Sequence, residues 1–195
     1  KTDNFLNLFN EVSKSKQSYK KVAELISKGE IICIFDGGSE TGPRSLGNRS
    51  ILCSAKREDV VYTLNNKIKG REFFRPLAPV ILEKKINNYF YVNKKYEHNL
   101  MWMGLTVKAK KVTIKNYRGC VHIDGSSRLQ VVKDKKLLIY KLLTETEKYG
   151  VDILINTSFN SSAEPIVFDY IDCYVSMVKM SIKYLYNNNK LYIRI

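Results

Sequence analysis

The segment ETGPRSLGNRSIL, residues 40–52, places two arginines, Arg44 and Arg49, in a loop that its glycines and proline keep out of a helix. The loop follows the apolar run IICIFD, residues 31–36, whose composition predicts a buried strand. Guanidinium groups on a short loop suit phosphate, because each planar fork can bind two oxygens at once. The segment is therefore a candidate phosphate-binding loop.

Two further polar segments, KIKGREFFRPLAP and NTSFNSSAEPIV, also stand at or near the ends of predicted strands. Ligand sites in open α/β sheets gather at strand ends, so we expect the three loops to meet. Taken singly, each arginine is more often a surface residue or the partner of a nearby carboxylate. Three such loops in one domain favour a phosphate site. Their candidate side chains are Arg44, Arg49, Lys69, Arg71, Arg75, Asn156, Ser158 and Asn160.

Bulk composition limits the kind of protein this is. The 195 residues favour one domain, 44% hydrophobic residues can fill a core, and a formal charge of +14 attracts polyanions. Apolar runs are too short to span a bilayer, and the start does not read as a signal peptide. The four cysteines and two histidines show no metal-ligand spacing. We expect buried, reduced thiols in a cytoplasmic protein with no protein-held metal and no membrane partner.

The elements expected to position the loops alternate between helix and strand, which predicts an α/β layered domain. We expect a polar lead-in or linker over residues 1–17 and one domain over residues 18–195. Residues 85–120 are the least legible part, with one or two strands between residues 99 and 115. Helices are predicted over 18–30, 57–69, 136–150 and 172–186, and strands or extended segments over 31–36, 50–54, 75–82, 127–132, 151–156 and 191–195.

Four segments resemble successive signatures of the C-terminal domain of the O-carbamoyltransferases. They are GPRSLGNRSIL, KIKGREFFRPLAPVIL, HIDGSSRLQVV and INTSFNSSAEPIV, and they occur in the family's order. That family includes enzymes that carbamoylate nodulation factors, cephalosporins and aminoglycosides. The resemblance covers about Ser18 to Cys173. Its domain is similar to the YrdC/Sua5 proteins, whose KxR…SxN tetrad is matched here by Lys69, Arg71, Ser158 and Asn160.

The resemblance implies a YrdC-like fold: a twisted, mostly mixed sheet with helices packed on it and a concave basic face. It also implies a reaction in two stages. Carbamoyl phosphate breaks down to carbamate and phosphate, and the carbamate then attacks the α-phosphorus of ATP to give carbamoyl-adenylate and pyrophosphate. An N-terminal transferase domain with an actin-like ATPase fold, in the same or a separate chain, passes the carbamoyl group to a hydroxyl of an acceptor.

The resemblance also implies roles for single residues. Lys69, Arg71 and Arg75 are the expected catalytic residues, and Arg44 joins Arg75 in binding phosphate groups, carbamoyl phosphate included. ATP would bring Mg²⁺, held mostly by phosphate oxygens and water. The remaining expected binding residues either contact the phosphates or the carbamoyl group or shape the pocket: Arg128, Ser158, Asn160, Asn156 and Arg49.

Three departures from the family pattern bear on these roles. Ser45 and Ala163 replace the family's alanine and glycine, and Ala163 is expected to restrict the turn after Asn160. The segment CSAKRED replaces an arginine-bearing stretch, so a basic role there would fall to Lys56 or Arg57. The family's histidine-rich metal motif and N-terminal domain do not occur in these residues.

Two other functions fit parts of the sequence. A YrdC/Sua5-type threonylcarbamoyl-adenylate synthase of tRNA modification would share the tetrad but use threonine and bicarbonate. The segments GPRSLGNRS and HIDGSSRLQ argue against it, because they belong to the carbamoyltransferase pattern. A non-catalytic module that binds RNA would explain the charge of +14 alone. Nucleic acid is not the partner that the loops favour.

Overall fold

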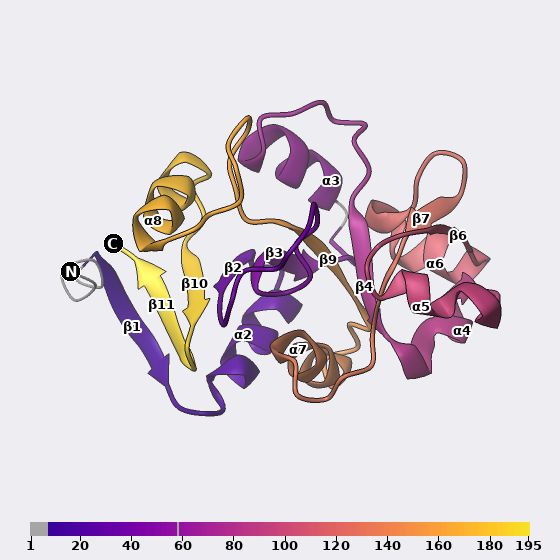
Figure 1. Ribbon diagram of the computed structural model, residues 1–195, viewed down its shortest axis with the longest axis horizontal. Coiled ribbons are helices and arrows are strands. Elements are labelled where there is room, and N and C mark those ends of the chain that lie inside the picture. Colours follow the sequence, from indigo (N-terminus) through magenta and orange to yellow (C-terminus); the bar gives the residue numbers. More distant parts are fainter. Residues whose placement is uncertain (1–7, 58) are drawn as a thin grey trace.

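An eight-stranded mixed sheet forms the centre of the molecule in the computed structural model, which describes residues 8–57 and 59–195 (Figure 1). Its strands are β1 (Phe9–Lys14), β2 (Ile32–Phe35), β3 (Arg49–Ser54), β4 (Ala78–Leu82), β8 (Gln130–Val132), β9 (Ile153–Ser158), β10 (Tyr184–Asn187) and β11 (Lys190–Arg194). Their order across the sheet is β1-β11-β10-β2-β3-β9-β4-β8. A second sheet joins β5 (Phe90–Tyr91), β6 (Thr106–Ala109) and β7 (Ser126–Arg128).

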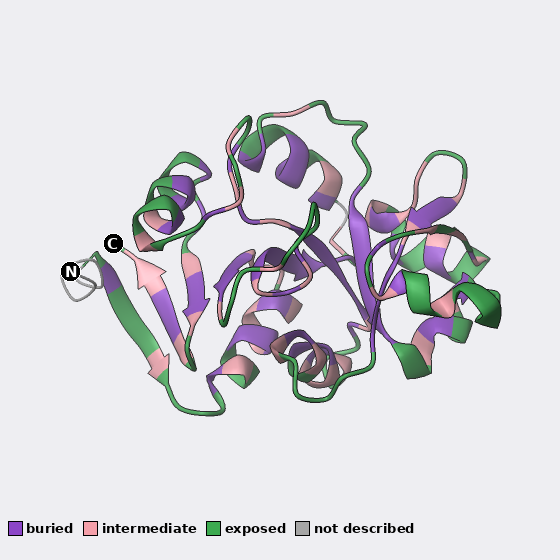
Figure 2. Ribbon diagram, in the orientation of Figure 1, coloured by how far each residue is buried: buried purple, intermediate pink, exposed green. Residues whose placement is uncertain are grey.

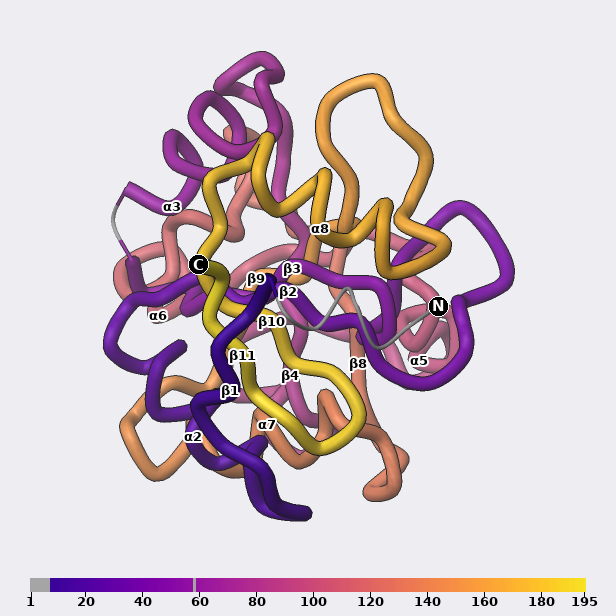
Figure 3. The backbone as a smooth tube through the Cα atoms, turned by 90° about the vertical axis from the view of Figure 1, so that its left-hand side faces the viewer, coloured from indigo at the N-terminus to yellow at the C-terminus, as the bar shows by residue number. Residues whose placement is uncertain are grey.

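Helices cover both faces of the large sheet. Those of ten residues are α2 (Ser18–Ser27), α7 (Leu138–Glu147) and α8 (Tyr170–Lys179). The shorter ones are α3 (Val60–Tyr62), the π-helical turn η1 (Thr63–Ile68), η2 (Glu83–Lys85), α4 (Ile86–Tyr89), η3 (Lys94–Tyr96), α5 (Glu97–Leu100), α6 (Lys111–Asn116) and η4 (Arg118–Cys120). Figures 1 and 3 show α2 and α7 on one side of the central strands and α3 and α8 on the other.

Burial on both faces explains why the central strands are largely apolar. In β2, Ile32 and Ile34 pack with α2 and α7, whereas Cys33 and Phe35 face the opposite core. Successive strand residues point to opposite faces, so a strand covered on both sides favours apolar residues on both faces. The central strands are buried throughout, while the connecting loops are largely exposed (Figure 2). The sheet is therefore a rigid support for the loops at its ends.

The strand directions bring the predicted loops to one edge of the sheet. Strand β3 is antiparallel to β2 and to β9, and β4 is antiparallel to β9 and parallel to β8. The ends of β2 and β9 therefore lie beside the starts of β3, β4 and β8. Register pairs fix this alignment: Phe35 lies opposite Arg49, Ser158 opposite Ser50, and Asn156 opposite Ala78.

The predicted α/β class with a mixed sheet is confirmed, and three local predictions were wrong. Residues 9–14 of the expected lead-in form edge strand β1, which pairs with β11. The helix predicted over 172–186 ends at Lys179, and residues 184–187 form β10. The strand predicted over 127–132 breaks at Leu129 into β7 and β8, which belong to different sheets.

Residues 85–120 contribute β5, β6 and short helices beside the small sheet, at one end of the molecule (Figure 1). All four cysteines are buried and free, as expected. Across residues 8–57 and 59–195, every helix is too short or too polar to cross a bilayer.

Candidate active site

Two adjoining hollows lie at the edge of the sheet where the loops meet. The larger hollow has a volume of about 570 Å³ and is lined by residues 69–72, 75, 158 and 160–163. Five predicted residues line it: Lys69, Arg71, Arg75, Ser158 and Asn160. Among its described lining residues, Glu72 is the one carboxylate, and its Oε2 lies 2.6 Å from Nε of Arg75.

The smaller hollow, of about 110 Å³, is lined by residues 43–45, 71, 76–78, 103, 128 and 156–158. Five predicted residues line it, Arg44, Arg71, Arg128, Asn156 and Ser158, and its described walls contain no acidic side chain. Arg71 and Ser158 line both hollows. The loops from three parts of the chain therefore converge, as the sequence predicted, on one cationic region with two compartments.

Lys69 is held by oxygen atoms of the loop after β9. Lys69 is only 4% exposed. Its Nζ donates to the carbonyl oxygens of Ser158 and Asn160 and to Oδ1 of Asn160. Ser158 Oγ donates to the same Oδ1 at 2.6 Å. The Lys69 ammonium group therefore fixes the Ser158–Asn160 loop as well as placing a charge in the larger hollow.

Arg71 is oriented by an asparagine that the sequence analysis did not single out. The buried Asn65 accepts from Nε of Arg71 at 2.8 Å, and its Nδ2 donates to the carbonyl oxygens of Phe73 and Arg75 at 2.9 Å each. Asn65 belongs to the π-helical turn η1, a rare geometry that often occurs at functional sites. A neutral acceptor orients the guanidinium without cancelling its charge.

Gly70 separates the two cations of the KGR sequence and has φ +53°, in the left-handed region that favours glycine. The chain reverses there, so Lys69 and Arg71 both line the larger hollow. A side chain at this position would be strained whatever space surrounds it.

The carboxylate of Glu40 organises the candidate phosphate-binding loop, residues 40–52, which is called the opening loop below. Glu40 does not pair with Arg44 in the described structure. Its Oε1 accepts from the backbone N–H groups of Leu46 at 2.7 Å and Asn48 at 2.6 Å, and its Oε2 accepts from that of Arg49 at 3.2 Å. Bonds from several N–H groups to one carboxylate define a tight loop. The loop holds Arg44 at the smaller hollow.

Arg49 lines neither hollow. Its guanidinium lies 3.8 Å from the centre of the Phe35 ring and donates to the carbonyl oxygens of Asp36, Gly37 and Asn48. It thus stabilises the backbone at the two ends of the opening loop, next to β2 and β3. Arg49 was predicted to be a residue that shapes the pocket. In the structure it supports the backbone of the loop beside the hollows.

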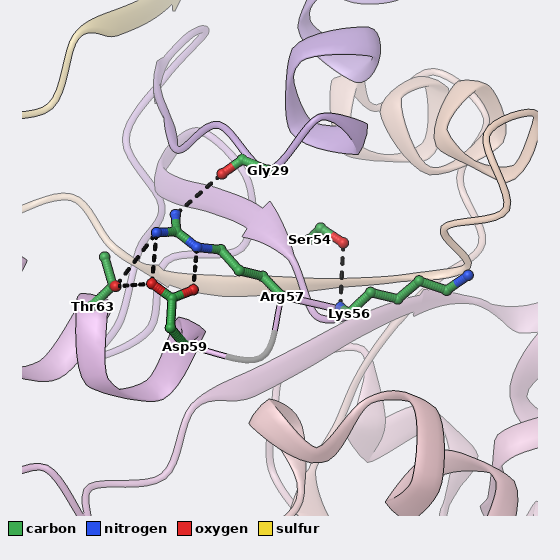
Figure 4. Close-up of polar contacts among 6 residues, drawn as sticks. All are labelled: Gly29, Ser54, Lys56, Arg57, Asp59 and Thr63. Carbon is green, nitrogen blue, oxygen red and sulfur yellow. Dashed lines mark hydrogen bonds and ion pairs between the residues drawn. The ribbon is translucent and has the colours of Figure 1, made fainter.

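The cations of CSAKRED also lie away from the two hollows. Arg57 binds Asp59 and donates to the Gly29 carbonyl oxygen at 3.1 Å, and Lys56 extends in another direction (Figure 4). Both line a separate hollow with Lys115 and Arg118. Neither residue therefore takes over a basic role in the candidate site.

The pKa values of the site cations reflect their confinement. Burial, reinforced by the charge of Arg71, lowers the pKa of Lys69 to about 7. Burial also lowers the pKa of Arg71, with Arg75 and Arg128 adding repulsion, and that of Arg128, with repulsion from Arg44. Arginine stays charged nevertheless. The site therefore carries positive charge that nearby carboxylates do not balance, and an anionic ligand would stabilise it.

The sequence pattern described as "Carbamoyltransferase C-terminus" matches residues 23–194. The chain belongs to the carbamoyltransferase C-terminal family. The nodulation protein NolNO of Sinorhizobium fredii is 37% identical over 161 residues, which are 80% of this chain and 23% of that protein. The chain spans about a quarter of the length of the first curated relatives it matches.

Solved structures share the fold of this carbamoyltransferase C-terminal domain. HypF of T. kodakarensis matches with a TM-score of 0.65 and 20% identity, over 93% of this chain and 21% of that one. Sua5 of P. abyssi, solved with L-threonine, matches with a TM-score of 0.63 and 15% identity, over 90% of this chain and 47% of that one. The predicted YrdC-like fold and the family resemblance are both confirmed.

We predict that Asn65→Ala will destabilise this domain by about 1–3 kcal/mol, because it leaves two carbonyl oxygens and Nε of Arg71 without their partner. Asn66→Ala is the matched control, since the neighbouring Asn66 is exposed. Urea unfolding measures both. Equal stabilities of the two variants would contradict the role given to Asn65.

Ala163, where the family pattern has glycine, has φ +57°. An L-residue with a Cβ atom is strained in this region. We predict that Ala163→Gly will raise the free energy of unfolding by up to about 1 kcal/mol. Ala23→Gly, within α2, should lower it, because glycine weakens a helix interior. Thermal unfolding tests the two opposite signs, and a loss of stability in Ala163→Gly would show that the turn is not strained.

Proposed function

We propose that the chain forms carbamoyl-adenylate from carbamoyl phosphate and ATP, as the C-terminal part of an O-carbamoyltransferase. The observation that carries this proposal is the convergence of Arg44, Lys69, Arg71, Arg75 and Arg128 on two adjoining hollows. Membership of the carbamoyltransferase C-terminal family supports the class of reaction.

The proposed chemistry has two steps. Water cleaves the mixed anhydride of carbamoyl phosphate, which gives carbamate, inorganic phosphate and a proton. A carbamate oxygen then attacks the α-phosphorus of ATP and forms a new O–P bond. The bond from the α-phosphorus to the bridging oxygen breaks, and pyrophosphate leaves with the electron pair. Carbamate is already an anion, so this attack needs no protein general base.

Charge is the main obstacle to this chemistry. ATP and carbamoyl phosphate together bring about six negative charges, and each close pair costs several kcal/mol at an effective dielectric constant near ~20. Phosphoryl-type transfer depends mainly on positioning and charge compensation. A group of cations held in place before the ligands arrive supplies both.

The two hollows suit two ligands of different size. We place the ATP phosphates in the larger hollow, beside Lys69 and Arg75, and carbamoyl phosphate in the smaller one, beside Arg44 and Arg128. Arg71 and Ser158 line both, so the carbamate oxygen and the α-phosphorus would meet at these residues. Asn160 holds the loop that carries Ser158 through its bond from Lys69.

The residues present fit a Mg²⁺ ion that arrives with ATP. Glu72 is the carboxylate at the larger hollow, and the part of the chain that the structure describes contains no group of three or more His, Cys, Asp or Glu side chains arranged for a metal. Mg²⁺ commonly keeps phosphate oxygens and water as ligands. When bound, the ion would neutralise phosphate charge.

Transfer to an acceptor hydroxyl belongs, in this proposal, to a further domain. The relatives are about four times as long as the matched region, which leaves room for a transferase domain in those proteins. We expect the 195-residue chain to make the adenylate and to need the actin-like ATPase-fold domain, in the same or a separate chain, for the transfer.

We predict that the chain will catalyse ATP–pyrophosphate exchange that depends on carbamoyl phosphate, and that Arg75→Ala will lower the rate by about 10²-fold or more. Loss of one preorganised charged donor commonly has an effect of this size. Arg75 is half exposed, so the variant should fold. Arg118→Ala is the matched control, because it removes the same charge from a separate hollow.

Radiolabelled pyrophosphate incorporated into ATP measures the exchange. Equal rates in Arg75→Ala and Arg118→Ala would contradict the placement of the phosphates. Exchange that needs threonine and bicarbonate would indicate the threonylcarbamoyl-adenylate reaction. RNA binding with a steep salt dependence and no exchange would indicate a polyanion-binding module.

We also predict that ATP binding takes up a proton near pH 8. The Lys69 pKa of about 7 means that its amine is mostly neutral at pH 8 in the free protein. Bound phosphates favour the charged form and raise this pKa, so close to one proton is taken up. Below about pH 6 Lys69 is already protonated, and its uptake should vanish.

Calorimetry of ATP binding in buffers with different ionisation enthalpies counts the protons. Lys69→Met removes the titrating amine and corrects for protons that other groups exchange. A proton count at pH 8 that is the same in this variant and in the unmodified chain would contradict the predicted role of Lys69.

A further inference from the structure

A third hollow, of about 510 Å³, lies at the end of the sheet opposite the candidate active site. It is lined by Tyr89, Gly150 and residues 55–57 and 115–119. Ser54, at the end of β3, lies opposite Leu154 near the start of β9, whereas Ser158 of the candidate active site lies at the other end of β9. The third hollow is therefore separate from the place of the proposed reaction.

Cations dominate the charge of the third hollow. Lys56, Arg57, Lys115 and Arg118 line it, and its described walls contain no carboxylate. Arg57 is already balanced, because its Nη2 lies 2.9 Å from Oδ2 of Asp59. Within the described residues, the charged groups of the other three cations have no ion pair or hydrogen bond. Three positive charges around the hollow are thus left without a protein partner there.

The acidic side chains at this end of the sheet bind other residues. Oδ1 of Asp152 lies 3.3 Å from Nζ of Lys85, and its Oδ2 accepts from the Tyr89 hydroxyl. Oε2 of Glu147 lies 2.8 Å from Nζ of Lys84. These described carboxylates therefore do not neutralise the cations of the third hollow.

The fold brings the cations together from distant segments. Lys56 follows β3 and extends away from the Arg57 side chain (Figure 4), whereas Arg118 belongs to η4. Gly119 permits this approach, because a Cβ atom there would lie 2.2 Å from Cγ1 of Val60 in α3. A larger residue would force η4 and α3 apart. The close packing of η4 on α3 therefore holds Arg118 beside the segment that carries Lys56.

The three unbalanced cations define the ligand as a multiply charged anion. A guanidinium can bind two oxygens of one phosphate, and each lysine adds a point charge. A phosphate group carries up to two charges, so two or three linked phosphates can balance the hollow. Its volume of about 510 Å³ is close to the 570 Å³ of the larger hollow, so a nucleotide-sized molecule has room.

We propose that the third hollow is a second anion-binding site, which takes a small molecule with two or more phosphate groups. Lys56, Lys115 and Arg118 contact the phosphates. Arg57 supports the site, because its bonds to Asp59 and to the Gly29 carbonyl oxygen fix the backbone next to Lys56. The segment CSAKRED thereby has a basic role at this end of the sheet.

Site-resolved binding tests the proposal, with inorganic tripolyphosphate as the probe. Amide chemical shifts of the ¹⁵N-labelled chain are followed by NMR at about 150 mM salt, where distant charges are screened. Gly119 and Gly150 report on the third hollow, and Gly70 and Ala163 report on the larger one. We expect saturable shifts of Gly119 and Gly150, with a dissociation constant that is fitted separately from that of the larger hollow.

The double variant Lys56→Ala/Lys115→Ala should raise the dissociation constant of the third hollow roughly tenfold or more, because it removes two charge-assisted contacts. Both lysines are exposed, so the variant should fold. Lys136→Ala/Lys141→Ala is the matched control. It removes the same charge from exposed positions that line none of the three hollows, so binding should be nearly unchanged.

Equal weakening in the two double variants would show that net charge alone attracts the probe, and would overturn the proposal. Unchanged shifts of Gly119 and Gly150 at millimolar probe would overturn it as well. Citrate carries less charge than tripolyphosphate and should bind more weakly, so equally tight binding of citrate would reject a phosphate ligand. The amides of the larger hollow report separately, so these outcomes do not depend on whether the chain forms carbamoyl-adenylate.

Discussion

Repulsion among the cations at one edge of the sheet is the constraint on which the rest of the site depends. Lys69 and Arg71 are held by carbonyl and amide oxygens, which orient them without neutralising them. Carboxylates in these places would cancel the field that an anionic ligand meets. Dipolar acceptors instead leave the charge available, while burial, reinforced by the neighbouring arginines, lowers the pKa of both residues. The rigid, doubly covered sheet withstands this repulsion because its stability comes from burial on both faces.

Much of the fold and of the site could be predicted because loop composition and strand hydrophobicity are local signals. The three loops, the tetrad and the central strands could all be located this way. Strand β10 could not be located in this way, because residues 172–186 are apolar at both helical and strand spacing. Where α8 ends and β10 begins, across residues 180–183, depends on packing. Strand β1 is an exposed edge strand, whose polar side chains resemble those of a loop.

The supporting polar residues were missed for a different physical reason. Asn65, Gln130 and Glu40 are polar residue types that usually lie on the surface, and nothing in their sequence neighbours indicates burial or a particular partner. Their roles depend on contacts with segments that the fold brings together, such as the Asn156–Gln130 bond between β9 and β8. The contacts of Arg49 could not be predicted for the same reason, because the Phe35 ring and the loop carbonyls that bind it become its neighbours only in the folded sheet.

Arg71 and Ser158 line both hollows and form the wall between them. This wall links the supporting residues to the chemistry. If each hollow holds one anion, the two ligands approach each other only across Arg71 and Ser158, so these side chains must be oriented before either ligand arrives. Asn65 orients Arg71 from the π-helical turn, and Lys69 fixes the loop of Ser158 from the residue just beyond that turn. One short stretch of chain therefore positions both sides of the wall. A change in its geometry would move the two reacting groups relative to each other while leaving each hollow able to bind its anion.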